Sequence, residues 1–141
     1  MSTVTLEIAK SIGEKAVTVA SRHGVLGVSV VVLDHTTSIR LAMRTETANL
    51  FGIDIAKAKA LSAMAFRSTT LSQNETLGQN QMLVSALTGI TQGKFLPLGG
   101  GSPIFDAQGV LIGAAAVAGS TQENDHAFIT EAITASGLST K

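Results

Sequence analysis

The sequence contains no cysteine, no tryptophan and no tyrosine. The absence of cysteine excludes disulfides, thiolate nucleophiles and cysteine metal sites. Only 14% of the 141 residues are charged, and ten basic residues balance ten acidic ones. Proteins that bind nucleic acids use a basic surface and stacking aromatic side chains, and this chain has neither. We therefore expect no nucleic-acid partner.

Long hydrophobic runs are also missing. The longest apolar runs are too short to cross a bilayer, and the first residues lack the basic start and apolar core of a signal peptide. We expect a cytoplasmic protein with no membrane partner. A length of 141 residues predicts one domain, residues 1–141, with a sizeable core.

The low charge density has a second consequence. A small monomer normally covers its surface with lysine and glutamate, whereas 45% of this chain is hydrophobic. Part of the surface must then be apolar, and exposed apolar patches commonly mark interfaces. The composition predicts self-association into a homo-oligomer.

Hydrophobic periodicity and turn residues predict an α+β domain. Two expected hairpins and one further extended segment give a five-stranded antiparallel sheet flanked by helices. The expected helices are 5–22, 47–67 (beginning near Phe51 or Asp54), 81–87 and 120–135, and the expected strands are 27–34, 39–44, 94–98, 104–106 and 110–118.

The stretch around Gly99, Gly100 and Gly101 is the most distinctive in the chain. Consecutive glycines allow a close approach to the backbone. Their N–H groups could bind an anion, or the loop could pack tightly against a strand or a neighbouring subunit. The spacing matches no nucleotide-binding motif. Beyond it, Ser120 and Glu123 have the spacing of a capping box at the start of the last helix.

Several pieces taken in order resemble one known family, the GlcG/HbpS-like proteins, which are heme-binding or associated with glycolate utilisation. The family includes the C-terminal domain of a corrinoid adenosyltransferase. The resemblance implies a profilin-like sheet, closed oligomers, and heme or a small organic acid as the ligand. It rests on the first helix leading into Val28–Asp34, on Asp54–Ala60 followed by Phe66, on Gly100–Ile104, and on Val110–Gly119 followed by Glu123, Asp125 and Ala127.

The chain departs from the family pattern at two places. The family commonly has Asp-x-Gly after the first long strand, where this sequence reads Asp34-His35-Thr36-Thr37. The glycine loop, Gly-Gly-Gly-Ser-Pro, is slightly longer than the usual one. Both departures are expected at pocket edges.

Two charged residues are candidate catalytic groups. On a helical wheel, Lys57 falls among the bulkiest apolar residues of its helix, where an ammonium must find a partner or lose its charge. It could hold a carboxylate or a heme propionate or act as a base, or it could reach solvent at the helix edge. Asp125 lies in the first turn of the last helix. It could act as a general base, or it could satisfy backbone N–H groups nearby.

The histidines are too separated for metal-ligand spacing, and no metal site is predicted. His23 ends an apolar helical face and is either a cap or core histidine or an axial heme ligand. His35, in a turn, is a candidate acid–base group, as is Glu75. Arg40 could clamp a carboxylate, and Glu123 is counted among the possible ligand-binding residues.

These residues leave two function hypotheses open. The first is a small-molecule-binding protein, with heme as the ligand the family implies, in a pocket formed by the glycine loop, the second helix and the start of the last helix. The second is a cofactor-independent enzyme of lyase, hydratase or isomerase type acting on a small carboxylate or carbonyl substrate. A third interpretation, a purely structural oligomer, would have the glycine loop filled by a neighbouring chain.

Overall fold

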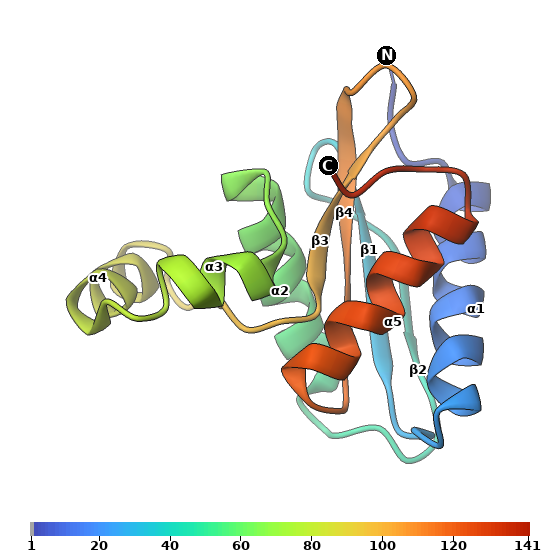
Figure 1. Cartoon of the computed structure of the whole chain (residues 1–141), viewed down its shortest axis with the longest axis horizontal. Helices are drawn as coiled ribbons and strands as arrows, with labels where there is room; N and C mark the ends of the chain where they lie inside the picture. Colours follow the sequence, from blue (N-terminus) through green and yellow to red (C-terminus); the bar gives the residue numbers. More distant parts are fainter. Residues whose placement is uncertain (1) are drawn as a thin grey trace.

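The computed structural model describes residues 2–141 (Figure 1). One antiparallel sheet has the strand order β2-β1-β4-β3. Helices α1 and α5 cover one face of the sheet and α2 covers the other (Figure 1). The elements are α1 (Leu6–Arg22), β1 (Ser29–Asp34), β2 (Ile39–Arg44), α2 (Gly52–Phe66), α3 (Thr70–Thr76), α4 (Gln81–Ile90), β3 (Gly101–Phe105), β4 (Leu111–Ala118) and α5 (Gln122–Ala135).

The α+β class and both hairpins are confirmed, but the described sheet has four strands and the prediction of five is wrong. The missing strand is the segment 94–98. Its Leu96 amide donates to Ser62 Oγ on α2 (2.7 Å), and Pro97 has no amide to donate. The segment is therefore attached to α2 and leaves the β3 edge free of it.

The helix ends follow ordinary capping chemistry with one correction. Thr5 caps α1 by accepting from the Ile8 amide (3.2 Å), as its position predicts. The cap of α5 is Thr121, which accepts from the Asn124 amide (3.1 Å). The predicted capping box of Ser120 and Glu123 is wrong, because the Ser120 amide is bound by a carboxylate one turn further on.

Small residues set the distance between α2 and the sheet. Ala56, Ala60 and Ala63 of α2 pack against the alanines of β4. At Gly101, where β3 begins, a Cβ atom would lie 2.5 Å from the Lys59 carbonyl oxygen of α2. This close packing brings the middle of α2 against the glycine loop that precedes β3.

Helices α3 and α4 form an arm that extends away from the sheet (Figure 1). The helix expected at 81–87 is confirmed and continues to Ile90, and α3, which was not among the expected helices, precedes it. No residue of α4 is buried. Within residues 2–141, the structure has no helix with the length and apolar character needed to span a membrane.

Candidate functional site

A buried ion pair joins α2 to α5. Lys59 Nζ lies 3.3 Å from Asp125 Oδ2 and donates to the Gly99 carbonyl oxygen (3.0 Å). Both charged side chains are almost completely buried. Asp125 also accepts hydrogen bonds from the amides of Ser120 (2.9 Å) and Gly119 (3.3 Å). The pair therefore connects four segments of the chain: α2, α5, the glycine loop and the turn before α5.

Burial dominates the electrostatics of this pair. Desolvation lowers the pKa of the Lys59 ammonium, and attraction to Asp125 only partly opposes it. Desolvation likewise raises the pKa of the Asp125 carboxyl against the opposing effects of Lys59 and the two backbone amides. Each group is thus easier to neutralise than it would be in water. Such shifts are typical of groups that exchange protons in functional sites.

The three glycines are required by the close packing around the ion pair. At Gly100, where φ is +129°, a Cβ atom would lie 2.5 Å from both Lys59 Nζ and the Val117 carbonyl oxygen. The amides of Gly99 and Gly101 donate to side chains of the protein, those of Gln122 (3.0 Å) and Thr70 (2.8 Å). The loop is therefore a packed wall, and two of its three amides are already used.

The ion pair lines a cavity of about 410 Å³. Its wall combines the glycine loop, the first half of α2 and the N-terminal turn of α5. The lining residues are Asn49, Gly52, Ile55, Lys59, Leu98, Gly99, Ala118, Gly119, Ser120, Gln122 and Asp125. We call this cavity the Lys59 cavity. It has the position that the first hypothesis gave to the ligand, although none of its described lining residues is a histidine.

The predicted placement of Lys57 is wrong, because its side chain is exposed. The prediction assumes that the bulky residues of α2 face the core. The face that meets β4 instead carries Ala56, Ala60 and Ala63, and Lys59 lies on that stripe. Its spacing of three from Ala56 and four from Ala63 is the sequence signal that could have identified it.

The other candidate residues are dispersed. Arg40 forms an ion pair with Asp34 (2.7 Å) within the β1–β2 hairpin, away from the Lys59 cavity. The hydrogen bond from the Thr36 hydroxyl holds the pKa of Asp34 below its usual value. His35 Nδ1 lies 2.7 Å from Thr3 Oγ1. None of these side chains lines the Lys59 cavity, and neither do those of Glu75 and Glu123, which are both exposed.

His23 follows the last residue of α1. Its Nδ1 lies 2.8 Å from the Val19 carbonyl oxygen. A carbonyl oxygen can only accept, so this contact fixes the proton on Nδ1 and leaves the Nε2 lone pair free in the neutral ring. The ring lies 5.5 Å from that of Phe128, and the residue is exposed.

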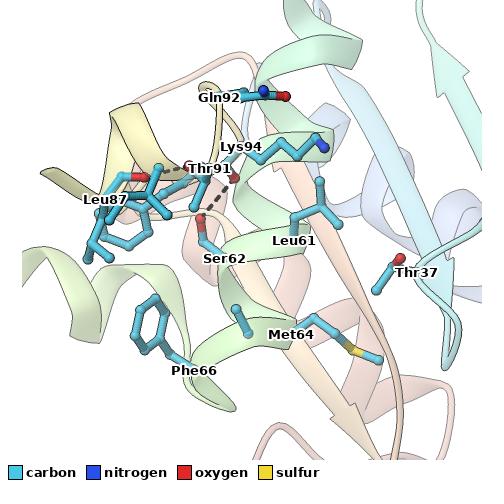
Figure 2. A pocket seen from close by; sticks show the side chains of 12 residues that line it. Thr37, Leu61, Ser62, Met64, Phe66, Leu87, Thr91, Gln92 and Lys94 are labelled. Atoms are coloured by element: carbon cyan, nitrogen blue, oxygen red, sulfur yellow. Dashed lines mark hydrogen bonds between the residues drawn. The ribbon is translucent and has the colours of Figure 1, made fainter. Parts of the chain in front are cut away.

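A second cavity, of about 450 Å³, lies between α2 and the α4 segment (Figure 2). Leu61 and Met64 of α2 line it on one side and Leu87 of α4 on the other. Figure 2 shows Met64 pointing toward Thr37 of the β1–β2 turn. We call this cavity the arm groove. Thr37 belongs to the segment that departs from the family pattern, so that departure does lie at a cavity edge.

Several solved structures share the fold of this chain over nearly its whole length. A structure described as a PduOC:heme complex is 26% identical, covers 98% of both chains and has a TM-score of 0.84. Klebsiella pneumoniae protein ORFY is 26% identical over 97% of this chain and 92% of its own, with a TM-score of 0.88. A double mutant of Streptomyces reticuli HbpS is 26% identical over 96% of this chain and 88% of its own, with a TM-score of 0.81.

Among curated protein sequences, none matches this chain. The family model described as "Haem degrading protein HbpS-like" matches residues 4–134. That range includes both sheet hairpins, the glycine loop and the Lys59–Asp125 pair. The chain therefore belongs to the HbpS-like family.

Proposed function

We propose that this chain binds heme and that His23 would hold its iron. Membership of the HbpS-like family and a relative solved with heme support heme or small-molecule binding at family level. The observation that carries the proposal for this chain is the His23 ring. Its Nδ1 is held by the Val19 carbonyl oxygen, which is the usual arrangement of a metal-ligating histidine, whose other nitrogen is free for the metal.

One exposed apolar side chain and one buried aromatic ring lie near His23. Leu26, which is 65% exposed, follows it in the loop to β1, and Phe128 packs against the ring. Arg22 adjoins it and carries a cation at the surface, where it pairs with Glu131 (2.7 Å). Heme, when bound, supplies the redox chemistry of its iron. The chain would fix the tautomer of His23 through Val19 and would offer Leu26 as an apolar contact.

We expect the His23→Ala variant to lose the Soret shift that hemin titration produces in the unchanged protein. The variant lacks the nitrogen that would hold the iron, while the backbone amide of residue 23 still caps α1. His35→Ala is the matched control, because His35 lies after the opposite end of β1 and its ring is bound to Thr3. The proposal is wrong if hemin gives no Soret shift, or if both variants retain the full shift.

A second candidate function is favoured by the Lys59 cavity. It is the binding of a small organic acid, and the observation is an ammonium group buried beside a carboxylate at the wall of that cavity. Calorimetric titration with pyruvate and glyoxylate measures this binding. Replacing Lys59 by methionine is expected to abolish it, because the cation that attracts the carboxylate is removed.

We also propose that a second copy of this chain covers the arm. An isolated helix of the length of α4 is marginal in water, and here none of its residues is buried by the rest of the chain. Met82 and Ile90 are 83% and 78% exposed. The helix has no charged residue, so two copies can meet over it without burying a charge.

Introducing like charges on α4 tests this assembly. We expect the Met82→Glu, Ile90→Glu double variant to elute from size exclusion with light scattering at the monomer mass, whereas the unchanged chain gives a multiple of it. The two exposed positions can accept charge without loss of core packing. A monomeric unchanged chain, or an unaltered oligomer in the variant, would refute the proposal. The Ser85→Lys variant, on the same helix, shows whether a charge at any position of α4 is enough to dissociate the oligomer.

A further inference from the structure

Lys59 differs from an ordinary structural lysine because its amine lines a cavity large enough for a small metabolite. The nitrogen is within reach of one acceptor that can take a proton, Asp125 Oδ2 at 3.3 Å, and one that cannot, the Gly99 carbonyl oxygen at 3.0 Å. A buried amine that transfers its proton to a neighbouring carboxylate becomes a nucleophile. The cavity provides space for an electrophile beside it.

We propose that Lys59 forms an imine with a small 2-oxo acid bound in the Lys59 cavity. The inference rests on the second candidate function, organic acid binding, and is independent of heme binding. The substrate class follows from the wall of the cavity. The positive end of the helix dipole at the N-terminal turn of α5 favours a carboxylate, and the neutral Lys59 amine requires a carbonyl carbon adjacent to that carboxylate.

The chemical step balances without any further reactant. Lys59 passes one proton to Asp125, and its lone pair then attacks the carbonyl carbon to form a C–N bond. The carbonyl oxygen takes up protons and leaves as water, so amine and ketone give imine and water. Asp125 is the only acidic side chain among the described residues lining the cavity, and it serves as acceptor and then as donor. Its carboxylate also offsets the charge of a protonated imine.

The lowered pKa of Lys59 supports this assignment, because a larger fraction of the amine is unprotonated at neutral pH than for a solvated lysine. Packing further restricts the amine. Gly100 has no side chain, and only for this reason can the Lys59 side chain extend past the loop to Asp125. The nitrogen is therefore held in one place at the wall of the cavity.

Reductive trapping tests the proposal on the unchanged chain. The protein is incubated with pyruvate or glyoxylate and cyanoborohydride, and modified lysines are mapped by mass spectrometry of peptides. We expect modification at Lys59 to exceed that at Lys57 by roughly tenfold or more. Lys57 is an internal control, since it is exposed on the same helix only two residues away and an accessibility-driven reaction would favour it.

The outcomes distinguish imine formation at Lys59 from simple binding of an organic acid in the Lys59 cavity. Modification concentrated at Lys59, and reduced in an Asp125→Asn variant, supports the imine. Modification that follows exposure, with Lys57 preferred, overturns it, and so does the absence of any adduct at Lys59. Calorimetric binding of pyruvate without a Lys59 adduct leaves the binding function standing and refutes only the imine, whereas the absence of both refutes both. The comparison within the unchanged protein remains decisive even if the variant does not fold.

Discussion

Replacing Lys59 by methionine is expected to lower the free energy of unfolding by about 3 kcal/mol or more. Methionine fills a similar volume, but it leaves Asp125 charged and buried without its partner, and removing one member of a buried pair is far more costly than removing a surface charge. Urea denaturation at neutral pH measures the effect. Lys57→Met is the matched control and should change stability by less than about 0.5 kcal/mol, because Lys57 is exposed.

The pH dependence of this loss has a definite sign. Burial already raises the pKa of Asp125 above its unfolded value, and in the methionine variant that pKa rises further because the opposing ammonium is gone. The folded variant then binds a proton more tightly than the unfolded chain does. Its stability deficit is therefore largest at neutral pH and shrinks as the pH falls toward about 4. A deficit that is constant between these pH values would show that lost packing, and not the unpaired charge, causes it.

Replacing Gly100 by alanine is expected to destabilise the fold by about 3 kcal/mol. The new Cβ atom would meet the backbone oxygen of Val117 at 2.5 Å, and a φ of +129° is strained for any residue with a side chain. Thermal unfolding followed by circular dichroism measures the loss. The same substitution should displace the Lys59 side chain, which a Cβ atom would also meet.

Gly109→Ala separates backbone strain from crowding. Gly109 lies in the β3–β4 turn with φ of +78°, and a Cβ atom there meets nothing within 4 Å. Its expected cost is therefore the left-handed strain alone, about 1 kcal/mol. Equal losses at the two glycines would contradict the tight packing of the loop around the ion pair.

Most of the fold was predictable because it depends on local signals. The caps and periodicity of α1, the β-branched run of β1 and the turn at Gly109 specify their elements with little help from distant contacts. The predicted fifth strand was wrong for a non-local reason. The Leu96 amide finds its acceptor on Ser62 of α2, and no pattern within residues 94–98 indicates this bond.

The site was predicted only in part. Asp125 and the glycine loop are brought together as expected, but the lysine that joins them is Lys59. The choice between two lysines depends on which face of α2 meets the sheet. The alanines of β4 select that face, because they pack best against the small residues of α2 and not against its bulky ones. A helical wheel of α2 alone does not contain this information.

The strand order delays closure of the sheet until late in the synthesis of the chain. The two inner strands, β1 and β4, pair residues 29–34 with residues 113–118, whereas each edge strand pairs with its immediate neighbour along the chain. A ribosome must therefore synthesise most of the protein before the centre of the sheet can close. Until then the β1–β2 hairpin leaves the inner edge of β1 unpaired. Nascent chains can therefore mispair at this edge until β4 emerges.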